Sequence, residues 1–338
     1  MSAKIGTRYG NDRVALQDVI PLDTPFLLFV DPSSACNFKC KFCPCGGGNK
    51  EVWASDKKVG IMSYEVYRKV IDDMTEFPHK LKTLRLYKEG EPLLNKRLPD
   101  MIHYARKKNV TERIDFTTNA SLLEKDLVLA IMDAGVDRIN ISVEALDTDG
   151  YEQVSGVKID YRQYLEKLRF LYKNKNNCHI FIKISDLGLG NHTEQDFYNM
   201  FGDICDEMAV EHVSSVWPEF DIKEELKRTE ELDIYGMDLN QRDPVQVCPY
   251  LFYSLCINSD GTVSACLMDW NHRLIVGNVH NESLLEIWNG SNMNKMRENH
   301  LNLNKNAYPT CSNCGQMKYA VLDNIDGYRE EILAKLQK

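Results

Sequence analysis

Short apolar runs alternate with longer segments of helical periodicity over the first two thirds of the chain. The run at 26–31 has the length of a buried strand, and Ser63 precedes apolar positions at helical spacing, as an N-cap does. The same reasoning predicts strands at 82–88, 113–120, 138–145, 179–185 and 212–220, and helices at 97–108, 122–134, 160–174 and 193–207. Such alternation predicts a parallel sheet covered by helices.

The predicted strands are too few to close an eight-stranded barrel, so we expect an α/β fold, a partial (β/α)6 barrel. Functional loops should then lie at the carboxyl ends of the strands. Downstream, Asp260-Gly261 lies between two alternating runs, which predicts a β-hairpin, and helices should follow near 283–288, 291–300 and 326–336. The expected organisation is an N-terminal extension (1–25), the barrel (26–220), a charged linker (221–247) and a hairpin-plus-helix domain (248–338).

Composition excludes several classes of protein. The chain has 338 residues, of which 43% are hydrophobic and 27% charged, as in globular proteins. Its net charge of −9 argues against a protein that binds nucleic-acid backbones or a basic membrane-surface protein. No apolar run approaches the roughly 18–20 residues that span a bilayer. The first nine residues lack a signal-peptide core, so we expect a cytoplasmic protein.

The 11 cysteines change this picture, because in a reducing compartment they indicate metal binding or catalysis. Cys36, Cys40 and Cys43 form a C-x3-C-x2-C array directly after the first predicted strand. Three thiolates on one loop can hold three irons of a [4Fe–4S] cluster and leave the fourth open to an outside ligand. Structural zinc is the alternative, with Cys45 as its fourth ligand.

With Phe42 as its aromatic residue, this C-x3-C-x-aromatic-C array resembles the signature of the radical S-adenosylmethionine (SAM) superfamily. The resemblance extends from about residue 26 to the end of the chain. It implies that SAM chelates the open iron. An electron from a donor such as flavodoxin or ferredoxin would then cleave SAM to a 5′-deoxyadenosyl radical, which abstracts a hydrogen atom from the substrate.

The resemblance also implies a set of SAM contacts. The family has a GGE-type loop after its second strand, which Glu89-Gly90-Glu91-Pro92 matches with glutamate in place of the first glycine. Phe42 would pack near the adenine, and Thr118, Asn119, Ser142, Glu144 and Lys183 would approach the ribose and carboxylate of SAM. An ordinary polar contact inside the barrel, or loop packing for Phe42, is the alternative at each position.

The cysteines of the last third resemble the ligands of a twitch domain, a shortened relative of the SPASM domain. That resemblance implies one auxiliary [4Fe–4S] cluster held by Cys248, Cys266, Cys311 and Cys314, and so two clusters in all; a structural zinc is the alternative. Cys256, inside the hairpin, is left over. It is either an ordinary buried residue or a hydrogen-atom donor.

The layout is similar to that of twitch dehydrogenases that act on the aminocyclitol 2-deoxy-scyllo-inosamine. This similarity implies an oxidoreductase that converts an alcohol of a small sugar or aminocyclitol to a ketone, with the auxiliary cluster as electron acceptor. Trp217 and Glu219, at the end of the strand predicted at 212–220, are candidate substrate contacts.

Three alternatives remain open. A radical epimerase would use Cys256 as its hydrogen donor. A peptide-modifying enzyme often carries an N-terminal recognition domain, for which the 35 residues before Cys36 are too short, so we favour the small-molecule substrate. A non-catalytic iron–sulfur or zinc protein would not cleave SAM.

Overall fold

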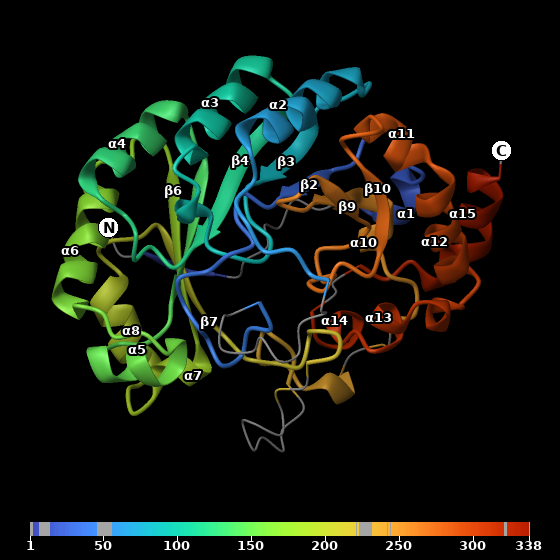
Figure 1. Ribbon diagram of the computed structural model, residues 1–338. Helices are drawn as coiled ribbons and strands as arrows, with labels where there is room; N and C mark the ends of the chain where they lie inside the picture. The colour runs from blue at the N-terminus through green and yellow to red at the C-terminus, as the bar shows by residue number, and fades with distance from the viewer. Residues whose placement is uncertain are drawn as a thin grey trace.

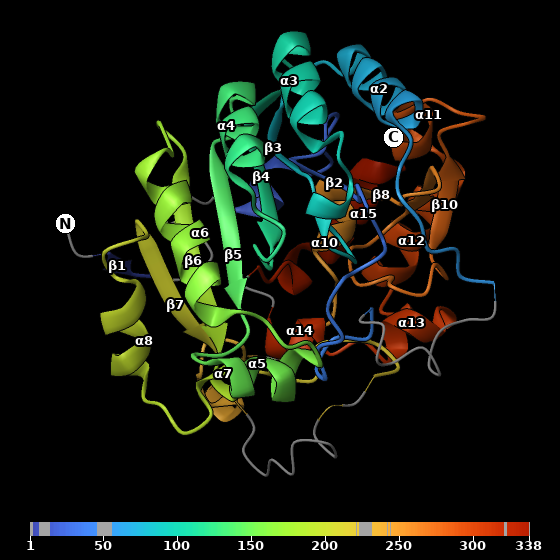
Figure 2. The same ribbon diagram turned by 60° about the vertical axis from the view of Figure 1, so that its left-hand side comes forward.

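The computed structural model describes residues 3–6, 14–45, 56–220, 222, 232–241, 243, 245–320 and 323–337. Its centre is a parallel sheet of strands in chain order, with helices along one face (Figures 1 and 2). The strands are β2 (Leu27–Val30), β3 (Leu81–Arg85), β4 (Thr111–Thr118), β5 (Arg138–Val143), β6 (His179–Ser185) and β7 (Glu207–Glu211). The expected partial (β/α)6 barrel is therefore confirmed.

The helices of the barrel follow the predicted pattern, and most begin and end as the sequence indicates. The Ser63 side chain accepts a hydrogen bond from Val66 N at the start of α2, and α4 ends at Gly135 with a φ of 87°. The helices are α2 (Tyr64–Asp73), α3 (Leu98–Lys108), α4 (Lys125–Ala134), α5 (Thr148–Ser155), α6 (Tyr161–Lys173), α7 (Asp186–Leu189) and α8 (Glu194–Phe201). Helices α5 and α7 were not predicted.

The two faces of the sheet differ in polarity. Residues such as Leu28, Leu84 and Ile114 point toward the helices and are fully buried. The opposite face, which we call the inner face, carries a row in register across β2 to β5: Phe29, Arg85, Asp115 and Arg138. Charged and aromatic side chains therefore line the inside of the partial barrel, where a substrate can find hydrogen-bond partners.

The hairpin of the last third belongs to the same sheet, which the sequence did not predict. Strand β8 (Ser254–Ile257) pairs in parallel with β2, with Leu27 opposite Ser254 and Val30 opposite Ile257. Strands β9 (Thr262–Ser264) and β10 (Ile275–Asn278) extend the sheet on that side, and β1 (Lys4–Ile5) pairs with β7 at the other edge. The sheet thus has ten strands.

The C-terminal helices pack beside this extension (Figure 1). They are α10 (Tyr250–Tyr253), α11 (Leu284–Asn289), α12 (Ser291–Leu301), α13 (Pro309–Ser312), α14 (Gln316–Tyr319) and α15 (Arg329–Leu336). Trp288 Nε1 donates to Leu22 O at 2.9 Å, and Leu284 N donates to Asp73 Oδ2 at 3.2 Å, so α11 is anchored on the barrel. Within the expected linker at 221–247, residues 221, 223–231, 242 and 244 lie outside the described residues.

The strand predicted at 212–220 is wrong. Strand β7 ends at Glu211, which lies opposite Ser185, the last residue of β6. Beyond that point the backbone leaves the sheet: His212 N donates to Ile234 O of the linker at 3.1 Å, and Pro218 O accepts a hydrogen bond from Trp270 Nε1 of the tail. Within the described ranges, no helix combines the length and the hydropathy of a membrane span.

Candidate active site

The first three clustered cysteines lie together in the loop that follows β2, at the carboxyl edge of the sheet. Burial raises the pKa of Cys36 to about 12, and the thiol of Cys43 contributes to this rise. Burial also raises the pKa of Cys40 well above its usual range, and Glu144, Cys43 and Cys36 add to the effect. The loop is fixed on α5, since Lys39 N donates to Ser155 O at 2.8 Å. The three thiols therefore lie near one another, with Cys40 buried and Cys36 and Cys43 half-buried.

The Glu89-Gly90-Glu91-Pro92 loop lies directly against this cysteine loop. Glu91 N donates to Ala35 O at 2.9 Å. A Cβ at Gly90 would lie 2.1 Å from Ala35 O and 2.3 Å from Ser33 O, which are backbone atoms that cannot move aside. Only glycine fits at position 90, so the close contact between the two loops depends on this residue.

The carboxylate of Glu91 joins that loop to the end of β4. It accepts hydrogen bonds from Thr118 Oγ1 at 2.6 Å, from Asn119 N at 2.8 Å and from Leu93 N at 3.0 Å. Burial raises the pKa of Glu91 to about 7, even though these three donors oppose the rise. Asn119 Nδ2 in turn donates to Asn37 Oδ1 at 2.9 Å. The side chains of Glu91, Thr118 and Asn119 thus bind one another and shape the loops.

Other predicted SAM contacts gather above the inner face. Glu144 lies beside the Cys40 thiol, and burial raises its pKa to about 7, against the lowering effect of Lys183. Lys183 forms an ion pair with Glu211, and Ser142 lies opposite Lys183 in the register of β5 and β6. Phe42 is half-buried against the hydrophobic core. The roles of these residues toward SAM stay predictions.

The four cysteines of the tail lie near one another, with Cys266 buried and Cys248, Cys311 and Cys314 half-buried. Burial raises the pKa of Cys248 to about 12, and Cys314 contributes; burial likewise raises the pKa values of Cys266 and Cys311, with Cys248 and Cys314 as neighbours of both. Helices α10, α13 and α14 surround this site, and Cys248 N donates to His300 Nδ1 at 3.4 Å. Four residues up to 66 positions apart in sequence therefore converge.

A polynuclear cluster and a single ion require different arrangements of the thiols. Within the described residues, no three His, Cys, Asp or Glu side chains converge as the ligands of one metal ion would. Zinc requires its ligand atoms about 2.0–2.3 Å from a common point, whereas each thiolate of a cluster binds a different iron. Cys45, the fourth ligand in the zinc alternative, is only 2% exposed and lies beside Cys43. The raised pKa values mean that ligation by thiolates would release protons.

The two candidate substrate contacts lie beyond the sheet. Because β7 ends at Glu211, Trp217 and Glu219 fall in the segment that connects the barrel to the tail, and not on a strand end as predicted. Trp217 is half-buried, whereas Glu219 is exposed with a φ of 60°. The segment is held by the tail, since Trp270 Nε1 donates to Pro218 O at 2.9 Å. Their role toward substrate stays a prediction.

A buried group of charges was missed by the sequence reasoning. Glu89 forms ion pairs with Lys57 at 2.9 Å, Lys88 at 2.5 Å and His272 at 2.7 Å. We call these four residues the ion cluster. His272 lies 183 positions after Glu89, and no motif links the two, so no signal in the sequence could have found this contact.

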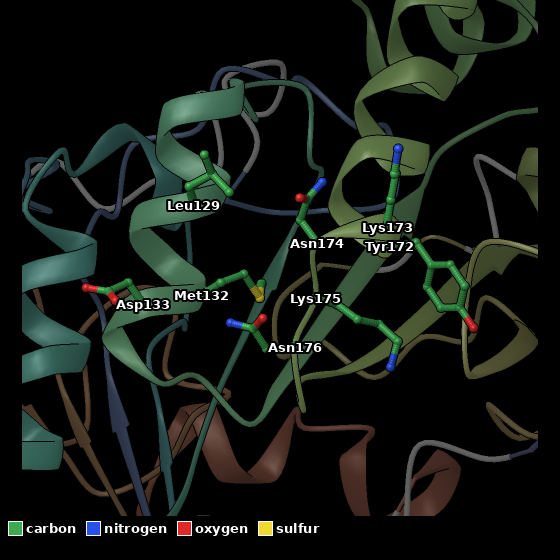
Figure 3. A pocket seen from close by; sticks show the side chains of 8 residues that line it. All are labelled: Leu129, Met132, Asp133, Tyr172, Lys173, Asn174, Lys175 and Asn176. Carbon is green, nitrogen blue, oxygen red and sulfur yellow. The ribbon is translucent and has the colours of Figure 1, made fainter.

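Cys256 is fully buried on the inner face, opposite Phe29 in the register of β8 and β2. Burial raises its pKa, and Lys88 opposes the rise. A separate cavity of about 720 Å³, lined by residues such as Lys173, Lys175 and Asn176, lies at the C-terminal ends of α4 and α6 (Figure 3). This cavity lies at the amino ends of the strands, whereas the first cysteine loop lies at their carboxyl ends. None of the residues that line the cavity is a candidate site residue.

Comparison with known proteins identifies the family. The sequence model of the radical SAM superfamily matches residues 30–204, more than half of the chain. The chain belongs to the radical SAM superfamily. Residues 248–315 also match the SPASM iron–sulfur cluster-binding domain, so this radical SAM protein uses SAM and [4Fe–4S] clusters.

Relatives of this radical SAM protein differ in their described activities. A probable GTP 3′,8-cyclase of Methanococcus maripaludis is 34% identical over 131 residues, which are 38% of this chain and 39% of the cyclase; the chain thus spans about two fifths of that relative. The structure of BtrN with AdoMet and 2-DOIA has a TM-score of 0.55 and 16% identity, and the match covers 89% of this chain and 97% of BtrN. SuiB of Streptococcus suis, bound to its precursor peptide SuiA, has a TM-score of 0.60 and 14% identity over 83% of this chain and 69% of SuiB. The BtrN and SuiB structures share the fold of this chain.

Replacing Gly90 by alanine tests the contact between the two loops. Because the new Cβ would collide with the backbone before Cys36, we expect Gly90→Ala to weaken SAM binding by about tenfold or more, as displacement of a binding loop by 1 Å can do. Gly60→Ala is the matched control, since a Cβ there meets nothing within 4 Å. Equilibrium dialysis with SAM measures both variants, and equal affinity of Gly90→Ala and wild type would contradict the account.

Iron analysis tests the two thiol sets. Anaerobically reconstituted protein should hold about eight irons per chain, four for each cluster. Replacing Cys36, Cys40 and Cys43 together by alanine should leave about four irons and abolish SAM cleavage, because only the tail set remains. Stoichiometric zinc with little iron in anaerobically purified protein would contradict this assignment.

Proposed function

We propose that this radical SAM protein oxidises an alcohol of a small hydroxylated molecule, a sugar or aminocyclitol, to a ketone. The observation that carries the proposal is that the four tail thiols lie near one another. If all four bind the auxiliary cluster, no iron is left open for substrate, and the cluster is suited to accept an electron. The substrate must then bind through protein side chains.

The inner face supplies suitable partners for a hydroxylated molecule. Arg85 donates to the Tyr87 hydroxyl at 2.8 Å, and Asp115 lies beside Arg85 in the next strand. Lys183 and Glu211 lie further toward the carboxyl edge, near the cysteine loop. Charged and hydroxyl groups of this kind orient sugars by hydrogen bonds and leave few apolar surfaces for a hydrophobic substrate.

When bound, the cofactors would supply the chemistry: hydrogen-atom abstraction from the alcohol carbon by the 5′-deoxyadenosyl radical and acceptance of one electron by the auxiliary cluster, with loss of the hydroxyl proton. The chain excludes water from this site, since Glu91 and Glu144 are at most 6% exposed. The neighbour BtrN, whose structure contains 2-DOIA, supports this proposal. The GTP cyclase relatives and the peptide-bound SuiB are compatible with other substrates.

Epimerisation is the second candidate, and the position of Cys256 favours it. Its side chain points to the inner face beside Phe29, where a thiol could return a hydrogen atom to a substrate radical. Complete burial of Cys256 favours packing instead. The two functions differ in their products: oxidation removes two hydrogens, whereas epimerisation leaves the mass unchanged.

Product analysis with sugars and aminocyclitols tests the proposal. We expect SAM cleavage to yield 5′-deoxyadenosine together with a carbonyl product, and Cys256→Ala to retain this activity. Replacing Cys311 or Cys314 by alanine should remove the oxidation while SAM cleavage persists, because the electron acceptor is lost. Mass spectrometry in deuterated water decides the outcome. A product of unchanged oxidation state that carries solvent deuterium would contradict oxidation and establish the epimerase.

A further inference from the structure

The ion cluster, Lys57, Lys88, Glu89 and His272, lies where the barrel meets the tail domain. Lys88 and Glu89 follow β3, whereas His272 belongs to the loop between β9 and β10. Lys88 Nζ also donates to Asn258 Oδ1 at 2.8 Å and to Asp269 O at 2.9 Å. Lys57 Nζ donates to Trp270 O at 2.5 Å. The ion cluster thus connects the two parts of the chain through several charged hydrogen bonds.

The ion cluster is almost closed to water, and its contacts favour the charged forms of Glu89 and Lys88. The side chains of Lys57 and Glu89 are each 1% exposed, and that of Lys88 is fully buried. Burial alone would raise the pKa of Glu89, but Lys88, His272 and Lys57 together hold it below its usual range. Burial alone would lower the pKa of Lys88, yet Glu89 and Asp269 hold it above its usual range. Removing one partner would leave a buried charge uncompensated, which is strongly unfavourable.

On the barrel side, the ion cluster leads to the loop of the first three cysteines. Glu89 immediately precedes Gly90, which has no room for a side chain against Ala35 O and Ser33 O. Any displacement of Glu89 is therefore passed to the backbone that comes just before Cys36. This backbone forms part of the site where the family binds SAM.

On the tail side, the ion cluster leads to Cys266. Asp269 N donates to Cys266 O at 3.2 Å, and Met268 N lies 3.4 Å from Cys266 Sγ. Lys88 bonds to the Asp269 carbonyl, and His272 to Glu89, so the loop after Cys266 is held at two points by the barrel. Ordering Cys266 as a ligand would order this loop, and with it the partners of Glu89.

We propose that Glu89 acts as a positioning residue that couples the auxiliary cluster to SAM binding, so that assembly of the auxiliary cluster strengthens the binding of SAM. The proposal rests on the assignment of Cys266 as a ligand under the proposed function, but not on the choice of substrate. Coupling between two sites is reciprocal, so bound SAM must stabilise the auxiliary cluster to the same extent. This coupling would be the role of Glu89, the glutamate that stands where the GGE-type loop of the family has its first glycine.

The first experiment removes the charge of Glu89 and keeps its shape. Glu89→Gln, with both clusters verified by iron analysis, should bind SAM about tenfold more weakly, within the range usual for coupled sites. Equilibrium dialysis without reductant measures binding alone, since SAM is not cleaved. Glu207→Gln is the control: Glu207 pairs with Arg138 on the same inner face, but at the amino edge of the sheet, and should leave SAM affinity unchanged. Unchanged affinity of Glu89→Gln would overturn the proposal.

A thermodynamic cycle separates coupling from a simple loss of structure. Replacing Cys311 and Cys314 by alanine removes the auxiliary cluster, and in the wild-type background this should weaken SAM binding. In the Glu89→Gln background the same replacements should cause no further loss, because the connection is already broken. Equal losses in both backgrounds would overturn the proposal.

If Glu89→Gln does not fold, His272→Gln provides the same cycle, since the His272 side chain is 11% exposed and lies at the margin of the ion cluster. The cycle measures SAM affinity without substrate. A protein that proves to be an epimerase or a peptide-modifying enzyme would therefore leave this result standing, and iron analysis of each variant would reveal a tail that holds no cluster.

Discussion

The parallel pairing of β8 with β2 is the interaction on which the site depends. Strand β2 leads into the loop of Cys36, Cys40 and Cys43, and β8 lies between Cys248 and Cys266. Their four registered pairs hold the hairpin that ends at Cys266 beside the strand that leads into the first cysteine loop. Backbone hydrogen bonds between buried strands are shielded from water, so this pairing holds the hairpin firmly against the barrel.

A shared sheet also explains why charge is concentrated on the inner face and at its carboxyl edge. Strands covered by helices on one face bury Leu28 and Ile114 there, which leaves the other face free for Arg85 and Asp115. Just beyond the end of β3, the opposite charges of Lys88 and Glu89 pair with each other where the barrel meets the tail domain. The apolar face packs against the helices and stabilises the fold. The polar residues of the other face are therefore free to bind ligands.

Much of the barrel could be predicted from the sequence, because its signals are local. The cap at Ser63, the helix end at Gly135 and the cysteine array after the first strand depend on residues close together in the chain. The strand predicted at 212–220 was wrong, since an alternating pattern does not reveal whether a neighbouring strand is available. In the structure the segment bonds to Ile234 of the linker and to Trp270 of the tail instead.

Contacts between distant segments could not be predicted. The pairing of Phe29 with Cys256 and the bond between Glu89 and His272 join residues about two hundred positions apart, with no spacing rule to connect them. The Gly90-Glu91 match located the loop after β3, but its fit against Ala35 became apparent only with the backbone in place. The hydrogen bonds from Thr118 and Asn119 to Glu91 likewise join the loop after β3 to the end of β4, which the spacing of these residues does not reveal; their contacts with SAM stay predictions.

The central claim is that the barrel and the hairpin form one sheet that unfolds as a unit. Amide hydrogen exchange of the anaerobic protein tests it most directly, because it reports the opening of individual strands. The account predicts that the amides of β8 at Leu255 and Ile257 are protected as strongly as those of β2 at Leu28 and Val30, and are lost together when the protein is destabilised. Rapid exchange of β8 while β2 stays protected would contradict it.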